Sequence, residues 1–246
     1  MILPAKKAEF MQVIILFDNS VYEKGFKAGW GISYFIEGGV LFDTGEAFEP
    51  LYYNMQKVGL GIADIKKIVI SHDHWDHWGG LWKILEMNNN LGVYICPNFS
   101  WQFKQRVKNK GAKIVEVKPK DEILPGIYTT GEIHAGYKSG QIYEQTLVLK
   151  GQNGLSLLTG CSHPGILEII KRAKELFGEN IYLAGGGFHL LNSEDRIIRF
   201  IARQMKKQGI KKAAPTHCSG KTAEDIFSLE YKEDFVRFGA GRKIVV

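Results

Sequence analysis

The chain has 246 residues, of which 45% are hydrophobic and 12% aromatic, so it can bury a large core as one layered domain. The formal net charge is +6, but the basic residues are scattered and form no stripe interleaved with aromatic residues, which makes nucleic acid an unlikely partner. The lysine–lysine pairs are Lys6-Lys7, Lys66-Lys67, Lys206-Lys207 and Lys211-Lys212.

Short apolar runs alternate with amphipathic stretches along the chain, a pattern typical of α/β layering. Residues 13–20 predict a first strand, and residues 31–45 predict a hairpin that turns at a Gly-Gly pair. Residues 66–74 predict a strand that runs into a polar loop. The segment WDHWGGLWKILEM, residues 75–87, predicts a helix.

The middle of the chain continues this alternation. Residues 93–97 and 113–117 predict two strands on either side of a helix that extends to about residue 110. Residues 145–161 predict a second hairpin, which turns between two glycines. A helix over residues 164–178 should follow, because proline is favoured in the first turn.

The last part predicts two more strand–helix units and a final strand. Residues 181–189 predict a strand that ends in a glycine turn, and residues 193–208 predict a helix. Residues 211–220 predict a short strand and loop, and a helix near residues 222–230 precedes the terminal strand at residues 241–246. The two hairpins and the alternation predict one αββα sandwich, with two sheets inside and helices outside.

The segment SHDHWDHWGG, which follows the apolar strand KIVI, carries the densest polar motif and three of the chain's seven histidines. Imidazole and carboxylate are common ligands of zinc, iron and manganese. In an extended loop His72 and His74 project to the same side, so they can bind one ion. Asp76 and His77 follow at the helix entrance and can face a second ion, whereas Asp73 should point away.

This pattern, H-x-H-x-D-H followed by Gly-Gly, resembles the signature of the metallo-β-lactamase superfamily. Four further segments match one subfamily in order: Asp43-Thr44-Gly45, residues 158–165 (LTGCSHPG), residues 185–190 (GGGFHL) and His217-Cys218. That subfamily of metal-dependent hydrolases includes 7,8-dihydropterin-6-yl-methyl-4-(β-D-ribofuranosyl)aminobenzene 5′-phosphate synthase. The resemblance covers nearly the whole chain and implies a single domain over residues 1–246, with the metal site at one edge of the two sheets.

The resemblance also suggests roles for individual residues. It implies two sets of metal ligands, one of His72, His74 and His163 and the other of Asp76, His77 and His217. Asp43 would support a ligand histidine from outside the coordination sphere. His189 is left open between substrate binding, proton donation, metal binding and simple packing in its loop. Asp76 and His189 are the candidate catalytic residues.

Two departures from the superfamily pattern concern Cys161 and His134. Cys161 stands where most members have an aspartate that bridges the metals, so it is either a thiolate ligand or a thiol beside a loosely held second ion. We expect the second outcome, with less than two equivalents of metal in the purified protein and tighter binding in Cys161→Asp. His134 is a minority candidate for a third ligand. Cys218 has the same ambiguity as Cys161, and Cys96 should lie in the core.

The sequence predicts a cytoplasmic protein. Its three cysteines are odd in number and widely spaced, which argues against a disulfide framework. No apolar run reaches the length of a membrane span, and the first residues lack a signal-peptide pattern. The sequence does not determine the oligomeric state.

The expected activity is hydrolysis of a small anionic ester, lactone or phosphoester by metal-bound hydroxide. One or two divalent ions would serve, with zinc favoured and manganese and iron as alternatives. A phosphate- or pterin-containing small molecule is the expected partner, with Trp30, Trp75 and Trp78 near the site for a flat ring. The alternatives are a synthase that condenses a pterin with an arylamine ribose phosphate, and a non-catalytic metal-binding module. A nuclease and a di-iron protein fit less well, because both normally carry an additional domain.

Overall fold

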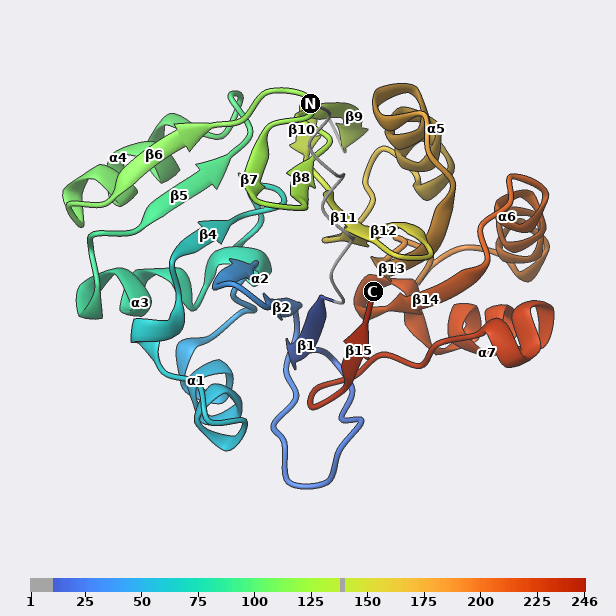
Figure 1. The fold of residues 1–246 in the computed structure, drawn as a ribbon, viewed down its shortest axis with the longest axis horizontal. Helices are drawn as coiled ribbons and strands as arrows, with labels where there is room; N and C mark the ends of the chain where they lie inside the picture. The colour runs from blue at the N-terminus through green and yellow to red at the C-terminus, as the bar shows by residue number, and fades with distance from the viewer. Residues whose placement is uncertain (1–10, 138–139) are drawn as a thin grey trace, which may run out of the picture.

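The computed structural model describes residues 11–137 and 140–246, and in it two β-sheets pack between two layers of helices (Figure 1). The first sheet has seven strands, in the order β15 (Lys243–Val245), β1 (Gln12–Phe17), β2 (Ser33–Ile36), β3 (Val40–Phe42), β4 (Lys67–Val69), β5 (Gly92–Ile95) and β6 (Lys113–Glu116). The second has six, in the order β14 (Lys212–Thr216), β13 (Ile181–Gly187), β12 (Gly154–Thr159), β11 (Leu147–Gly151), β8 (Ile127–Thr129) and β7 (Glu122–Leu124). A separate hairpin is formed by β9 (Ile133–Tyr137) and β10 (Gly140–Glu144). The predicted αββα sandwich is confirmed.

The helices divide between the outer faces of the two sheets (Figure 1). On the first sheet lie α1 (Phe48–Lys57), α3 (Leu81–Met87) and α4 (Trp101–Asn109), and the short α2 (Trp75–Trp78) precedes α3. On the second sheet lie α5 (Ile166–Phe177), α6 (Asp195–Lys207) and α7 (Gly220–Tyr231). Single 3₁₀ turns occur at Ile62–Asp64, His217–Ser219 and Lys232–Asp234.

Strand β1 shows why these apolar runs are nearly continuous. Val13 and Ile15 point into the core between the two sheets, whereas Ile14 and Leu16 point into the core under the helices. Successive side chains alternate between the faces of a strand, so a strand covered on both faces needs apolar residues throughout. Fully burying each such side chain contributes about 1.5–3 kcal/mol. Because the two sheets share one core, we propose that residues 1–246 form a single domain.

The topology also brings the motif loops to one end of the sandwich. Strands β3 to β6 run parallel to one another in the first sheet. Strands β12 to β14 do the same in the second. Parallel strands end at the same edge of a sheet, and ligand sites collect in the loops beyond those ends. The loops after β4, β12, β13 and β14 carry most of the predicted metal-site residues.

Some local expectations need correction. The helix predicted over residues 75–87 is divided into α2 and α3 at Gly79 and Gly80. A Cβ at Gly79 would lie 1.9 Å from the carbonyl oxygen of Glu46, so only glycine allows this close approach. Helix α5 begins at Ile166, two residues after Pro164. Helix α1 and strands β7 to β10 were not predicted. Residues 1–10, including Lys6-Lys7, lie outside the described residues.

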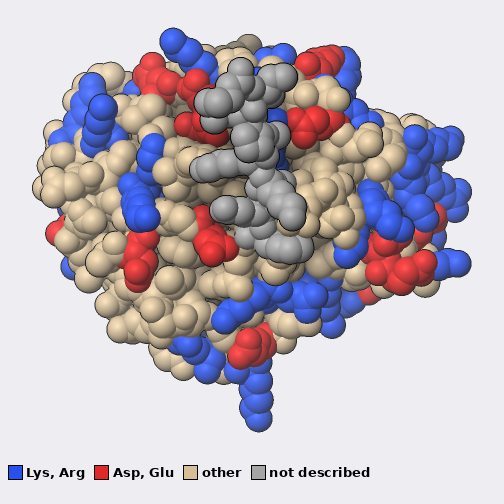
Figure 2. Space-filling view, viewed as in Figure 1, with Lys and Arg blue, Asp and Glu red and all other residues tan. Residues whose placement is uncertain are grey.

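The surface carries mixed charges. On the face shown in Figure 2, Lys and Arg are spread among Asp and Glu and are not gathered into one stripe. Within the described chain, no helix combines the length and the apolar character that a membrane crossing requires.

Candidate metal centre

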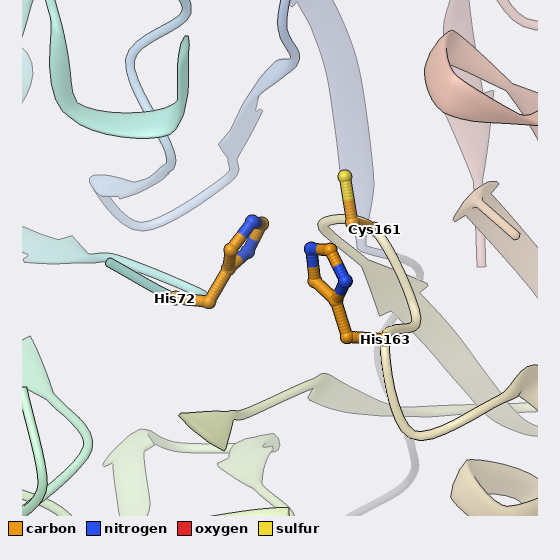
Figure 3. Close-up of side chains that lie close together, drawn as sticks. All are labelled: His72, Cys161 and His163. Carbon is orange, nitrogen blue, oxygen red and sulfur yellow. The ribbon is translucent and has the colours of Figure 1, made fainter. Parts of the chain in front are cut away.

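Histidines of the SHDHWDHWGG motif meet side chains from the second sheet at one end of the sandwich. The ring centroids of His72 and His77 lie 4.1 Å apart, and those of His72 and His74 lie 4.7 Å apart. His163, in the loop after β12, lies 4.7 Å from His72. Figure 3 shows these two side chains reaching toward each other, with Cys161 beside them. The fold thus brings together residues from both halves of the chain.

Asp43 orients two of these rings. Its carboxylate is fully buried just beyond β3, and Oδ2 accepts a hydrogen bond of 2.7 Å from Nδ1 of His77. The carboxylate also accepts bonds of 2.7 Å from the backbone N–H and the hydroxyl of Ser71. The Ser71 hydroxyl in turn accepts a bond of 2.9 Å from Nδ1 of His72. Outer partners of this kind fix the tautomer of metal-binding histidines. This geometry is compatible with the supporting role expected for Asp43, which stays a prediction.

The Nε2 atoms of His72 and His77 face lone-pair donors of other side chains. Nε2 of His72 lies 3.0 Å from Nδ1 of His74. Nε2 of His77 lies 3.4 Å from Sγ of Cys161 and 3.6 Å from Oδ2 of Asp76. Lone-pair donors that face one another at these separations can share a proton or bind a common cation.

His217 reaches the same region from the loop after β14. Its Nε2 lies 3.5 Å from Oδ2 of Asp76, and this buried atom has no hydrogen-bond partner in the described part of the chain. Its Nδ1 lies 2.8 Å from Oδ1 of Asn19. The neighbouring Asp18 is fully buried and accepts hydrogen bonds of 2.7 and 2.9 Å from the Thr216 hydroxyl. The sequence analysis missed Asp18 and Asn19, although this polar pair, directly after β1, was a usable signal.

Glu144 holds the loop after β12 in place. It is the last residue of β10 and is fully buried. Its carboxylate accepts hydrogen bonds from three successive backbone N–H groups, at 2.8 Å from Cys161, 2.8 Å from Ser162 and 2.7 Å from His163. No sequence motif marks Glu144, so this role emerges only from the tertiary structure.

Cys161 lies between two histidine groups. One group combines it with His72 and His163, and the other combines it with His77 and His217. Within each group the ligand atoms lie within 4.8 Å of one another. The thiol therefore occupies a shared position, as the bridging aspartate does in the superfamily pattern. The expectation that the second ion is loosely held stays a prediction.

The backbone is strained at this end of the sandwich. Six described residues other than glycine have positive φ, and four of them belong to the site. These are Asp43 (φ 55°), Ser162 (φ 59°), His189 (φ 55°) and His217 (φ 52°). A left-handed conformation costs about 1–3 kcal/mol for such a residue and persists only where the surroundings enforce it.

The electrostatics of the site suit a cation. Burial, with a contribution from the neighbouring rings, lowers the pKa of His72 well below its ordinary value and that of His163 to about 2. Burial also acts to lower the pKa of His77, but the Asp43 carboxylate and then Asp76 reverse this and raise it to about 9. The proton on His77 thus balances buried carboxylates, a task that a divalent ion can take over. Imidazole, carboxylate and thiolate are the donors that zinc prefers, so these residues fit one or two such ions.

The two remaining histidines lie at or beyond the margin of the centre. His189 is exposed, its ring centroid is 4.4 Å from that of His163, and a hydrogen bond with Cys218 raises its pKa. His134 is exposed on β9, with its ring 5.6 Å from that of Tyr143. His134, like His74 and Asp76, belongs to none of the three described groups whose ligand atoms lie within 4.8 Å of one another. His74 and Asp76 lie beside other candidate ligands, whereas the ring contact described for His134 is with Tyr143, so its candidacy as a ligand gains no support.

Asp73 points away from the histidines, as expected. Its carboxylate accepts hydrogen bonds of 3.1 Å from Nε1 of Trp78 and 2.9 Å from the backbone N–H of Ser100. The Trp78 ring lies 5.3 Å from that of Trp82, and Trp78 is partly buried against the core under the helices. Trp78 therefore contributes to packing, and its indole N–H is bonded to Asp73.

A cavity of about 220 Å³ opens beside His74. Its lining residues are Asp73, His74, Asn98, Phe99, Ser100, Gln141, Ile142 and Tyr143. Beside His217, Trp30 is 40% exposed, and its ring lies 5.1 Å edge-on from the imidazole. Trp75, directly after His74, is 55% exposed. The centre is thus accessible to a small molecule and has aromatic rings at its rim.

Known proteins resemble this chain in sequence and in structure. The family model of the metallo-beta-lactamase superfamily matches residues 32–134. The chain is 31% identical to 7,8-dihydropterin-6-methyl-4-(beta-D-ribofuranosyl)-aminobenzene-5'-phosphate synthase of Methanocaldococcus jannaschii, over 92% of this chain and 93% of that protein. It resembles the crystal structure of Tm1679, a metal-dependent hydrolase of the beta-lactamase superfamily, with a TM-score of 0.80 and 30% identity over 96% of this chain and 99% of that one. The metallo-beta-lactamase fold protein YhfI from Bacillus subtilis shares the fold, with a TM-score of 0.69 and 14% identity over 95% and 99% of the two chains.

Proposed function

This chain belongs to the metallo-β-lactamase superfamily, and we propose that it is a metal-dependent hydrolase that cleaves an ester, lactone or phosphoester bond in a small molecule. The observation that carries this proposal is the convergence of donor atoms from both sheets. Nε2 of His77 and of His217 face the same oxygen of Asp76, at 3.6 and 3.5 Å, and Cys161 joins them to the histidines on the other side.

Six side chains form the proposed ligand set. We assign His72, His74 and His163 to one ion, and Asp76, His77 and His217 to the other. Zinc suits these donors best, and manganese and iron are the alternatives. When bound, ions of this kind lower the pKa of a coordinated water and polarise a carbonyl or phosphoryl oxygen.

The protein's own groups then orient the reactants. Asp43 and Ser71 hold the rings of His77 and His72 through Nδ1, so that Nε2 of each ring remains available. Asp76 is our other candidate catalytic residue, because its Oδ2 lies 3.6 Å from Nε2 of His77 and 3.5 Å from Nε2 of His217. His189 is our candidate proton donor to the leaving group, because its ring is exposed beside that of His163 at a centroid distance of 4.4 Å.

The cavity beside His74 suggests how a substrate would lie. Among its described lining residues there are aromatic rings and amides but no Lys or Arg. An anionic group of the substrate would therefore lie at the metal centre, and an uncharged part would occupy the cavity. The exposed rings of Trp30 and Trp75 can cover a flat group from the rim.

Metal analysis of purified variants tests this proposal. We expect His72→Ala and His217→Ala each to lower the bound metal per chain, and both to lower hydrolysis of a panel of phosphoesters, lactones and thioesters. His134→Ala is the matched control, because this histidine lies outside the centre and should leave the metal content unchanged. Unchanged metal content in both centre variants would contradict the ligand assignment. Full metal content with no turnover of any substrate would favour a non-catalytic module.

A condensing synthase is the second candidate, and the 31% identity to the Methanocaldococcus jannaschii enzyme favours it. The product in that enzyme's name joins a dihydropterin to a ribofuranosyl-aminobenzene phosphate. Incubating this protein with a pterin bearing a leaving group and the aminobenzene ribofuranoside phosphate separates the two activities. A joined product would establish the synthase, whereas hydrolysis of the pterin compound alone would support the hydrolase.

A further inference from the structure

The loops after β12, β13 and β14 bring two thiols and an imidazole together. These strands are adjacent and parallel, and the loops that follow them carry Cys161, His189 and Cys218. The ligand atoms of the three side chains lie within 4.8 Å of one another. Both thiols are buried, whereas His189 is exposed. We propose that these residues form a sulfur-rich cation site that binds a thiophilic divalent ion such as zinc, in addition to the two histidine groups.

The local backbone favours this arrangement. Gly187 lies between the thiols, and a Cβ there would be 2.6 Å from Sγ of Cys218 and 3.1 Å from Cα of Cys161. Only glycine therefore allows the two loops to approach this closely. The carbonyl of Cys218 accepts hydrogen bonds from the backbone N–H groups of Leu190 and Leu191, at 3.1 and 3.0 Å. These bonds tie the segment that carries His189 to the loop of Cys218.

The donor set determines the class of ion. Zinc binds thiolate sulfur at about 2.3 Å and histidine nitrogen at about 2.0–2.1 Å, and three protein ligands can leave a fourth position open. The ligand atoms of this group are close enough to reach one ion with small side-chain rotations. Each thiol would release its proton to solvent on binding. Two thiolates would then balance the charge of a divalent ion. While such an ion is bound, His189 would be one of its ligands and could not act as the proton donor proposed above.

Cys161 couples this site to the histidine centre. Its sulfur belongs to the group with His189 and Cys218 and also to both histidine groups. The inference does not depend on hydrolytic activity, since it concerns only the ligands of a cation. Under this inference Cys218 is a metal ligand and not an inert core thiol.

Cobalt titration tests the inference in the reduced, metal-free protein. Co²⁺ alone is added, and sulfur-to-cobalt charge-transfer absorption reports each thiolate ligand. We expect wild type at saturation to show the intensity of two thiolates and Cys218→Ser to show that of one. His189→Ala should weaken cobalt binding in this band by about tenfold or more. Cys96→Ala removes the third buried thiol, which belongs to none of the described metal-sized groups, and should match wild type.

The result that would overturn the inference is a band in Cys218→Ser as intense as in wild type, or no thiolate band in wild type. Circular dichroism shows whether each variant is folded, and the exposed His189 provides a second variant if Cys218→Ser does not fold. His72→Ala separates this inference from the proposed hydrolytic centre. If the sulfur site exists, that variant keeps the two-thiolate band even when it loses metal from the histidine centre.

Discussion

At the scale of single residues, Asp43 accepts hydrogen bonds of 2.7 Å from His77 and from both donors of Ser71. Asp43→Asn preserves the shape but removes the charge, and it places an amide donor against another donor. We expect metal binding to weaken by about 10–100-fold, because the supported rings lose their fixed orientation. The free energy of unfolding should fall by about 1–3 kcal/mol. Competition with a chelator measures the first effect, and urea denaturation measures the second.

Asp73→Asn is the matched control within the same motif. Asp73 accepts hydrogen bonds from Trp78 and Ser100 but from no histidine of the centre. We expect its replacement to leave the metal affinity unchanged. If Asp43→Asn and Asp73→Asn weakened metal binding equally, the proposal that Asp43 orients the histidine rings would be wrong.

A second residue-scale prediction concerns Asp18 and pH. Burial raises the pKa of this carboxyl from 3.8 to about 6, although hydrogen bonds, the one from Thr216 above all, act to lower it. The folded protein therefore binds this proton more tightly than the unfolded chain does. The contribution of Asp18 to the free energy of unfolding is largest below about pH 4 and declines as pH rises through about 6.

Asp18→Asn removes this titration. Between about pH 4 and about pH 7, the free energy of unfolding of the variant should improve relative to wild type by about 2–3 kcal/mol. Urea denaturation of both metal-free proteins at the two pH values provides the measurement. A difference between variant and wild type that does not change with pH would show that Asp18 has no raised pKa in the folded protein.

At the scale of elements, local sequence patterns predicted the strands and turns that depend on neighbouring residues. The hairpin of β2 and β3 was predicted from its Gly-Gly turn, and the strand before His72 was predicted from its apolar run. No sequence signal marked Glu144, and the polar pair directly after β1 was the one signal for Asn19. The roles of Glu144 and Asn19 depend on hydrogen-bond partners that are distant in sequence. For the same reason the sequence grouped the histidines but did not show how Cys161 connects them.

The loop after β12 yields a prediction at this scale. A Cβ at Gly160 would lie 2.1 Å from Oγ of Ser71 and 3.1 Å from Oδ2 of Asp43. Gly160→Ala would therefore separate the two sheets where the centre forms, and we expect it to lower the free energy of unfolding by about 3 kcal/mol or more. Gly136→Ala is the control, because a Cβ there meets nothing within 4 Å. Thermal unfolding compares the two, and equal melting temperatures would refute the tight contact.

At the scale of the whole molecule, buried negative charge is concentrated at one end of the sandwich. Four carboxylates are buried there, namely Asp18, Asp43, Asp76 and Glu144, and no Lys or Arg is buried anywhere in the described chain. Buried charges are costly unless they are paired. The strained backbone of the same loops adds to this cost. A bound cation would offset both, and it would join ligands from the two sheets into one unit.

Removal of the metal should therefore lower the free energy of unfolding of the whole protein, and not only loosen the loops of the metal centre. A ligand that binds only the folded state stabilises it by about 2.7 kcal/mol when its free concentration is 100 times its Kd. We expect a chelator to lower the free energy of unfolding by about this amount and added zinc to restore it. Unfolding should remain a single transition, because the two sheets share one core. In His72→Ala, which lacks one proposed ligand in the loop after β4, the chelator should cause a smaller loss than in wild type. The same stability with and without metal would show that the centre is formed by the protein alone and that its carboxylates do not need a cation.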